Sequence, residues 1–248
     1  MLRTAVIIAG GEGSRLKPLS NNKPKAMVEI NGRPMLYWTL RWLKFHGVRN
    51  VVIGVAYKKE KILSYMKANK NFGLNAQFSV HTIEGGTAQG FRLAISRFVI
   101  DENFIAMNCD EVTNMHLPNL VRVHEKKQPL VTMALAPFHC RFSVVETTRD
   151  GFVSGFKYGH MLPNAPVSIG IYVFNRGIVN HIPNTGSIEH IVFTPLAEKR
   201  KIACYWLGAD EQWISVNDMK NVREVEENPQ LFQLKHSRKN AKKVLRIL

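Results

Sequence analysis

Residues 4–34 read TAVIIAGGEGSRLKPLSNNKPKAMVEINGRP and form the most informative stretch of the chain. The β-branched run from Thr4 to Ile8, which leads directly into glycines, is typical of a buried parallel strand followed by a loop. Gly10, Gly11 and Gly13 carry no side chains, so their backbone N–H groups can closely approach an anion. The stretch therefore predicts a strand that ends in an anion-binding loop.

The same loop is rich in positive charge. Its four cations are Arg15, Lys17, Lys23 and Lys25. Pro18 and Pro24 stiffen the loop, and the combination suits a polyanion such as a nucleoside triphosphate. The spacing matches neither a Walker A loop nor a full dinucleotide fingerprint, because Leu16 stands where a third glycine is needed. The alternative is a glycine turn with solvated lysines, since a basic patch is often only a charged face.

Length and composition indicate one α/β domain. A chain of 248 residues can bury a large core. It holds no apolar run near the roughly 18 residues that span a bilayer. Met1-Leu2-Arg3 leads into a short strand, which is wrong for a secretory signal. Cys109, Cys140 and Cys204 lie far apart without a CxxC pair, so we expect reduced core thiols in a cytoplasmic protein.

Hydrophobic periodicity alternates between strands and helices in the first half. The sequence predicts strands at 50–56, 76–81 and 104–108, and helices at 34–47, 58–69 and 87–98. This order predicts a doubly wound, mainly parallel, Rossmann-like sheet. Ligands of such sheets bind beyond the carboxyl ends of the strands, where both the glycine loop and Asp110 fall.

The pattern changes after residue 130. Short strands are expected at 131–136, 143–146, 153–157 and 169–174. We expect them to add antiparallel strands to the sheet and to form the wall of a second pocket. A helix at 187–199, a strand at 202–206 and a closing helix at 218–227 follow. The predicted domain spans residues 1–228.

The chain has a net charge of +15, and its last 20 residues contribute strongly to it. Residues 229–248 contain six Lys or Arg and no acid, so nine positive charges remain for the rest of the chain. Apolar residues are interspersed among them, so we expect a packed C-terminal helix with its charges outward. The alternatives are an arm that binds a membrane surface, nucleic acid or a neighbouring subunit.

The first loop resembles the signature of the sugar-1-phosphate nucleotidylyltransferases, GGxGxRLxPLTxxxPKxMxxxxGxP. The matching segments are 10–20, Pro24-Lys25-Ala26-Met27 and Gly32-Arg33-Pro34. The resemblance implies that the loop holds the triphosphate and that Lys25 contacts phosphate at the reacting centre. The implied nucleotide-binding loop residues are Ala9, Gly10, Gly11, Gly13, Ser14 and Arg15. Arg15 and Lys25 are the catalytic candidates.

Two acidic segments bear on metal binding. Asp110 ends an apolar strand, and Asn108-Cys109-Asp110 resembles the N-G-D of the family, whose Asp binds the metal. Mg²⁺ needs only one or two carboxylates besides phosphate and water. A strand-end Asp can also simply cap the next turn.

The second metal ligand falls near Trp213. Ser215 stands where one form of the family motif has its metal Asp, whereas Val216-Asn217-Asp218 fits the other form. Asn217 then takes the ligand position. Asp218 is the alternative ligand, or the N-cap of the final helix.

The base and sugar pockets follow from the same resemblance. Residues 84–90, EGGTAQG, resemble the family segment in which a glycine, here Gly86 beside Thr87, lies against the nucleobase. The same glycine also suits a turn that begins the third helix. His81 is a candidate for base contact, although a lone His is more often structural.

On the sugar side, residues 168–174, SIGIYVF, resemble the strand NAGIYVF. The first residue of that strand contacts sugar hydroxyls, which implies roles for Ser168 and Gly170. The E-K-P segment of the family is missing, because Tyr158 and Gly159 occupy its Glu and Lys positions. Lys157 and His160 are the nearby groups that can bind the sugar phosphate instead.

These features predict Mg²⁺-dependent transfer of a nucleotidyl group from a nucleoside triphosphate to a sugar 1-phosphate. The nucleophile is already an anion, so no Ser/His pair is required, and none is apparent. The alternatives are cytidylyl or guanylyl transfer to a non-sugar phosphate, such as an alcohol or choline phosphate, and a non-catalytic nucleotide-binding relative. Nucleic-acid binding is not expected, because the chain has no RNP-like motif or zinc spacing. A homo-oligomer is compatible with the sequence.

Overall fold

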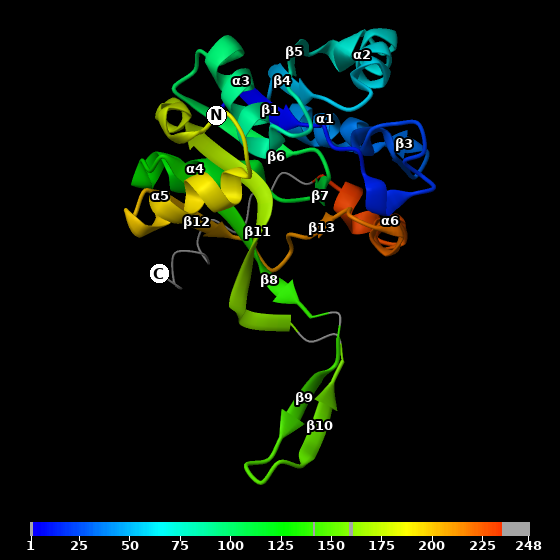
Figure 1. Ribbon diagram of the computed structural model, residues 1–248, viewed down its shortest axis with the longest axis vertical. Helices are drawn as coiled ribbons and strands as arrows, with labels where there is room; N and C mark the ends of the chain where they lie inside the picture. Colours follow the sequence, from blue (N-terminus) through cyan, green and yellow to red (C-terminus); the bar gives the residue numbers. More distant parts are fainter. Residues whose placement is uncertain (1, 141, 159–160, 235–248) are drawn as a thin grey trace.

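The computed structural model describes residues 2–140, 142–158 and 161–234. Its centre is a seven-stranded sheet in the order β12-β8-β11-β6-β1-β4-β5 (Figure 1). The strands are β1 Thr4–Ile8, β4 Asn50–Val55, β5 Asn75–Val80, β6 Asn103–Asn108, β8 Val131–His139, β11 Met161–Asn175 and β12 Ile202–Trp206. The expected strands at 50–56, 76–81, 104–108, 131–136, 169–174 and 202–206 are therefore present.

The sheet is mainly parallel, as the sequence predicts. β1 pairs in parallel with β4 and β6, and β4 with β5. β11 is antiparallel to both β6 and β8, and β12 is parallel to β8. Among the seven described strands, only β11 is reversed. The expected antiparallel addition in the C-terminal half is therefore present as β11, whereas β8 and β12 run in the same direction as the first four strands.

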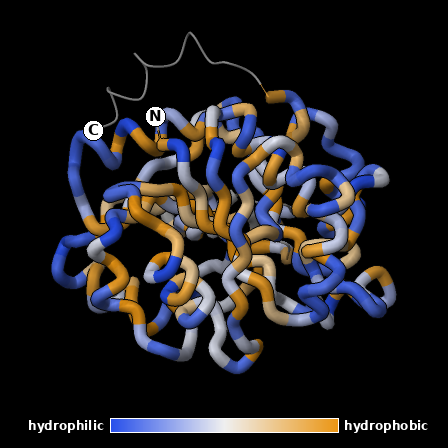
Figure 2. Tube along the Cα trace, turned by 90° about the horizontal axis from the view of Figure 1, so that it is seen from above, coloured by the Kyte–Doolittle hydropathy of each residue, from blue (hydrophilic) through white to orange (hydrophobic). Residues whose placement is uncertain are grey.

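Helices cover both faces of the sheet, so the fold is doubly wound. The helices are α1 Met35–Phe45, α2 Lys59–Ala68, α3 Gly86–Phe98, α4 Leu117–Lys127, α5 Thr194–Glu198 and α6 Met219–Glu226. Alternate residues of β1 enter two separate cores: Ile7 packs with residues of α1, α2 and α4, and Val6 with residues of α3 and α5. The tube in Figure 2 shows hydrophobic central strands and a more hydrophilic periphery.

The helix ends follow ordinary local rules. α1 starts after Pro34 and stops just before Gly47, whose φ of 86° is left-handed. The helix expected at 187–199 is divided into a π-helix, η5 Glu189–Phe193, and α5. Pro195 lacks an N–H, so it cannot donate to the carbonyl four residues earlier, and the wider turn avoids that position. α4 was not predicted from the sequence.

A long hairpin stands off the body of the protein. β9 Val144–Thr147 and β10 Val153–Lys157 pair only with each other in the described sheets (Figure 1). We call residues 142–158 the arm. The sequence correctly predicted both strands, but these two do not join the central sheet in the described residues. Their exposed apolar side chains, such as Phe156 at 57% exposure, pack against no core. The second pocket expected in this half of the chain stays a prediction.

A third, smaller core closes one end of the molecule. It joins Leu16 and Val28 of the first loop to Val216 and Val222 near α6. Leu231, on the short 3-10 helix η6 Pro229–Phe232, is buried in the same cluster. The predicted domain boundary at 228 thus falls before residues that still pack on the body. Residues 235–248, most of the predicted C-terminal helix, lie outside the described residues.

The cysteines only partly match the expectation. All three are free thiols, but Cys109 alone is buried, whereas Cys140 is partly exposed and Cys204 exposed. Core placement was therefore wrong for the last two. Nowhere in the described ranges is a helix long and apolar enough to cross a bilayer.

Candidate active site

The glycine loop and Asp110 meet at the carboxyl edge of the sheet. Cys109 N donates to Ile8 O at 3.0 Å, which places the ends of β1 and β6 side by side. Gly13 has a left-handed φ of 75°, and a Cβ there would lie 3.0 Å from the Cβ of Lys25. Lys25 N also donates to Gly11 O at 2.9 Å. The glycines thus allow the loop to fold tightly against Lys25.

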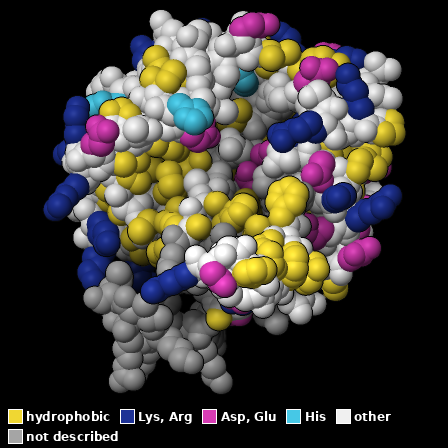
Figure 3. Space-filling view, turned by 60° about the horizontal axis from the view of Figure 1, so that its bottom comes forward, with side chains coloured by type: hydrophobic (Ala, Val, Ile, Leu, Met, Phe, Trp, Pro, Cys, Tyr) yellow, Lys and Arg dark blue, Asp and Glu magenta, His cyan; other side chains and the backbone are white. Residues whose placement is uncertain are grey.

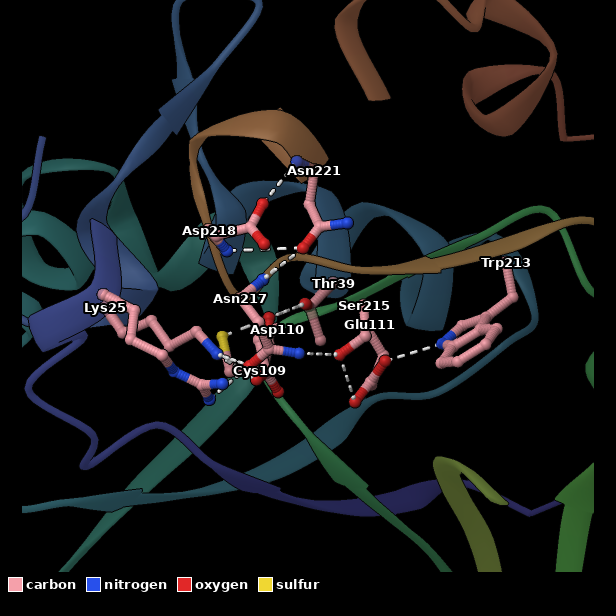
Figure 4. A network of polar contacts seen from close by, with 11 residues as sticks. Lys25, Thr39, Cys109, Asp110, Glu111, Trp213, Ser215, Asn217, Asp218 and Asn221 are labelled. Atoms are coloured by element: carbon pink, nitrogen blue, oxygen red, sulfur yellow. Dashed lines mark hydrogen bonds and ion pairs between the residues drawn. The ribbon is translucent and has the colours of Figure 1, made fainter. Parts of the chain in front are cut away.

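Lys25 is the centre of a small polar cluster (Figure 4). Its ammonium forms an ion pair with Asp110 and donates a hydrogen bond to Asn217 Oδ1 at 2.7 Å. Arg15 Nη2 donates to the same oxygen at 3.3 Å. These side chains come from the glycine loop, the end of β6 and the segment before α6. The structure therefore brings together both catalytic candidates and two of the metal candidates.

A buried carboxylate supports this cluster from the side. Trp213 Nε1 donates to Glu111 Oε2 at 2.6 Å, and Ser215 Oγ donates to Glu111 Oε1 at 3.2 Å. Asn217 Nδ2 then donates to Ser215 Oγ at 2.8 Å, so its Oδ1 is directed toward Lys25. Burial, together with the neighbouring Asp110 charge, raises the pKa of Glu111 well above its usual value. The two donated hydrogen bonds partly offset that effect.

Asp218 has a different position from Asn217. It is the N-cap of α6: its side chain accepts from Asn221 N at 2.9 Å, and Asn221 Oδ1 accepts from Asp218 N at 3.3 Å. This reciprocal capping box confirms that Asp218 caps the final helix. The oxygen that faces Asp110 across the Lys25 ammonium belongs to Asn217.

These residues fit a magnesium ion. The described residues contain no group of three His, Cys, Asp or Glu able to hold a metal. Asp110 and Asn217, however, both present an oxygen to one point, where the Lys25 ammonium lies. Mg²⁺ prefers oxygen ligands and commonly takes few from the protein when phosphate supplies the rest. Asp110 and Asn217 are thus the pair suited to hold it.

His81 lies behind the glycine loop. A Cβ on Gly10 would meet His81 Nε2 at 2.6 Å, and Cβ atoms on Gly54 and Gly90 would meet the same ring within 3.4 Å. The residue is only 8% exposed, and burial lowers its pKa. Its neutral ring therefore packs against the glycine loop at Gly10.

Gly86 and Thr87 contact another part of the protein. Gly86 has a φ of 63°, and a Cβ on it would lie 2.5 Å from Gly186 O. The Thr87 hydroxyl accepts from Ile188 N at 2.9 Å and donates to Glu189 at 3.3 Å. The space that a side chain on Gly86 would fill is thus occupied by the 186–189 segment. These contacts connect the start of α3 to η5.

On the predicted sugar side, Gly170 lies directly against the polar cluster. Its φ is 68°, and a Cβ there would be 2.7 Å from Glu111 Oε1. Ser168 is exposed at the same bulge of β11, and its hydroxyl donates to Tyr172 OH at 3.3 Å. Lys157, by contrast, lies on the arm and forms an ion pair with Glu146. In a single chain the structure does not bring Lys157 to the other predicted sugar-side residues, Ser168 and Gly170. His160 lies outside the described residues.

Sequence reasoning missed three members of the site. Glu111, Trp213 and Asn221 were not assigned any role. Glu111 accepts hydrogen bonds from both Trp213 and Ser215, and Asn221 accepts one from Asn217 N. Asp218 followed three residues later by Asn221 resembles a capping box and could have marked Asn221. A second acid directly after Asp110 was the available signal for Glu111.

Comparison with known proteins decides the family. A family model described as "Nucleotidyl transferase" matches residues 4–231. The chain belongs to the nucleotidyl transferase family. Its relatives include sugar-1-phosphate nucleotidylyltransferases, in agreement with the resemblance of the first loop.

Two relatives illustrate the range of this family. Mannose-1-phosphate guanylyltransferase catalytic subunit beta of Drosophila pseudoobscura pseudoobscura is 29% identical over 224 residues, covering 88% of this chain and 60% of the relative. D-glycero-alpha-D-manno-heptose 1-phosphate guanylyltransferase of Aneurinibacillus thermoaerophilus is 28% identical over 176 residues, 70% of this chain and 75% of the relative. The chain thus spans about 60% of the length of the first curated relatives it matches.

Solved structures share the fold. HddC from Yersinia pseudotuberculosis superposes with a TM-score of 0.71 at 21% identity, over 91% of this chain and 99% of that one. A putative glucose-1-phosphate thymidylyltransferase from Bacillus anthracis gives 0.72 at 16% identity, over 95% and 97%. At these identities the similarity establishes the architecture.

Proposed function

We propose that this chain catalyses transfer of a nucleotidyl group from a nucleoside triphosphate to a sugar 1-phosphate. The observation that carries the proposal is the convergence of Lys25, Asp110 and Asn217 beside the glycine loop. Family membership and the names of the relatives support the reaction class. A cytoplasmic location is part of the proposal, because that compartment keeps free cysteines reduced.

In this reaction, a phosphate oxygen of the sugar 1-phosphate attacks the α-phosphorus of the triphosphate. A new P–O bond forms, the bond from the α-phosphorus to the bridging oxygen breaks, and pyrophosphate leaves with that electron pair. The nucleophile is already an anion, so no general base is needed. Catalysis then consists of positioning and of charge neutralisation.

We assign the chain's residues to these tasks by position. The N–H groups of Gly11 and Gly13, with the exposed Arg15, bind the leaving pyrophosphate. The Lys25 ammonium stabilises negative charge on the reacting phosphate, where one such donor typically contributes 10²–10³-fold. Asp110 and Asn217 would hold Mg²⁺, which would neutralise phosphate charge and act as a Lewis acid.

The acceptor side of the site has polar groups for a polyol but no assigned cation for the acceptor phosphate. Gly170 lies against Glu111, and Ser168, two residues earlier on β11, offers an exposed hydroxyl for a polyol. Among the described residues, the lysine that the family resemblance implies there has no counterpart near the site, since Lys157 pairs with Glu146 on the arm. The altered acceptor side permits a second candidate, transfer to a phosphate of an alcohol or of choline.

The direct test is pyrophosphate release with each of four nucleoside triphosphates and a panel of sugar 1-phosphates, choline phosphate and alcohol phosphates. GTP with mannose-type sugar phosphates is tried first, because two of the relatives named above are guanylyltransferases. Mg²⁺-dependent release with a sugar phosphate supports the proposal. Release only with a non-sugar phosphate supports the second candidate. Nucleotide binding without release with any acceptor indicates a non-catalytic relative.

A further inference from the structure

The arm has one apolar and one polar face. Phe156 is paired with Val145 across the hairpin, and the rings of Phe156 and Tyr158 are stacked at 6.4 Å, so these side chains share one face. The other face carries the ion pair between Glu146 and Lys157. An amphipathic hairpin of this kind normally packs its apolar face against something.

In a single chain this face is open to solvent. Val145, Phe156 and Tyr158 on this face are 44%, 57% and 78% exposed, and Phe142 and Phe152, just before β9 and β10, are 81% and 70% exposed. Figure 3, which looks at the molecule with the lower end of Figure 1 brought forward, shows hydrophobic side chains gathered on this end of the molecule and Lys and Arg mostly around its edge. An isolated two-stranded hairpin is marginal in water, so packing against a partner would stabilise the arm.

We propose that the arm is an interface between two copies of this chain, which meet through their apolar arm faces. The distribution of charge favours a second copy of this chain as the partner. Glu146 and Asp150 balance Arg149 and Lys157, so the arm is neutral while the remainder of the chain carries the entire net charge of +15. Two bodies of equal charge repel each other, and the arms are where they can approach without that repulsion.

The neutral arm also disfavours other occupants. Nucleic acid and anionic lipid surfaces are recognised by clustered cations, and the two cations of the arm each have an acid nearby in sequence or in an ion pair. A symmetric contact, in which the same face of each copy packs on its counterpart, needs only one apolar surface.

The available area is sufficient for such a contact. Four aromatic side chains of the arm, each about 150–250 Å² in area, are more than half exposed and together offer on the order of 500 Å² per copy. Val145 and Val153, which are 44% and 56% exposed, add apolar area to the arm. Two copies would then bury roughly 1,200 Å², the lower limit of a specific interface.

Sedimentation velocity over a range of protein concentrations tests the proposal. The wild-type chain is expected to dimerise, and to remain dimeric in high salt, because apolar contacts are not screened. Phe156→Ser combined with Tyr158→Ser should weaken association at least tenfold, as expected for aromatic anchors. Phe152→Ser, on the turn, is a second, milder variant. Ile100→Ser, an 88% exposed apolar residue between α3 and β6, is the matched control and should change nothing.

Circular dichroism and thermal melting verify that each variant is folded. A wild-type chain that stays monomeric at every concentration overturns the proposal, whether the arm is then free or covered by residues 235–248. A dimer that survives both arm variants overturns it as well, because the contact then lies elsewhere. Dissociation of the wild-type dimer by salt alone would indicate a charge-based contact and would equally overturn it. None of these outcomes depends on nucleotidyl transfer.

Discussion

Lys25 Nζ lies 2.7 Å from Asn217 Oδ1, although 192 residues separate the two in sequence. The same ammonium is paired with Asp110, so one cation holds together the first loop, the end of β6 and the segment before α6. A cation that holds two oxygen ligands at one point is well placed to exchange them for phosphate. The following predictions test this arrangement and its surroundings.

Replacing Lys25 by Ala should lower turnover by about two orders of magnitude or more, the scale of one lost electrostatic donor. The side chain is partly exposed, so the fold should survive, which a melting curve verifies. Steady-state pyrophosphate release is the measurement. Lys23→Ala, on the same loop, is the control. Wild-type turnover in folded Lys25→Ala would remove this residue from the mechanism.

Asp110→Asn keeps the size of the side chain but removes its charge. We expect lower activity and a higher Mg²⁺ concentration for half-maximal rate, because an amide binds the ion more weakly than a carboxylate. Titration of activity with Mg²⁺ measures this shift. An unchanged Mg²⁺ dependence would show that the ion is held elsewhere.

Asn217→Ala and Asp218→Ala should differ in kind. Asn217→Ala removes the oxygen that faces Asp110 and should shift the Mg²⁺ dependence with little change in melting temperature. Asp218→Ala removes the cap of α6 and should destabilise the protein by about 0.5–2 kcal/mol. The two variants are compared by Mg²⁺ titration and by thermal melting. The reverse pattern would assign the ligand role to Asp218.

Gly170→Ala should destabilise the protein and disturb the site together. The added Cβ would lie 2.7 Å from Glu111 Oε1 at a φ of 68°. Gly32→Ala is a matched control, since Gly32 has a φ of 69° with nothing within 4 Å. The control isolates the backbone cost, about 1 kcal/mol. Equal losses of stability in both variants would mean that the contact with Glu111 is unimportant.

Stability should fall on acidification through one buried histidine. His124 Nε2 is 3.0 Å from Asn103 Oδ1 and its Nδ1 is 2.9 Å from Thr132 Oγ1, an arrangement suited to the neutral ring. Burial lowers the pKa of His124 to about 4. The unfolded chain, with a pKa near 6.5, therefore binds the proton first, and stability is lost as pH falls from about 6.5 to 4.

Within that window the loss approaches roughly 1.4 kcal/mol per pH unit from this single group. Denaturant unfolding at several pH values measures the slope. His124→Gln, which does not titrate, should be less stable at neutral pH but should show a shallower slope. An identical slope in the variant would place the acid sensitivity in other residues.

The sequence predicts the sheet and the nucleotide half of the site well, for local reasons. β1 and its glycine loop lie in one continuous stretch, and the boundaries of α1 are set by Pro34 and Gly47. α4 was missed because its apolar residues, at Leu117, Leu120 and Val121, are few among polar neighbours. Their helical spacing was nevertheless present in the sequence.

What the sequence could not give depends on contacts between distant segments. Both strands of the arm are visible in its alternating residues, but no local pattern states that the hairpin leaves the sheet. Likewise, Glu111 becomes part of the site only because β13 Trp213–Ser215 pairs with β7 Glu111–Thr113. The choice between Asn217 and Asp218 as the metal candidate depended on the capping box, which only the structure shows. Asp218 caps α6, whereas the side chain of Asn217 contacts Lys25.

The pairing of β7 with β13 also sets an order of events during synthesis of the protein. Segments up to residue 113 can build four neighbouring strands, the glycine loop and the end of β6 while the chain is still emerging from the ribosome. The 213–221 segment that supplies Asn217 and the partners of Glu111 is made about 100 residues later. Because contacts over such separations are slow to form, the polar cluster should be completed late in folding. A nascent or prematurely terminated chain would then have its phosphate loop in place but could not organise Lys25 for catalysis.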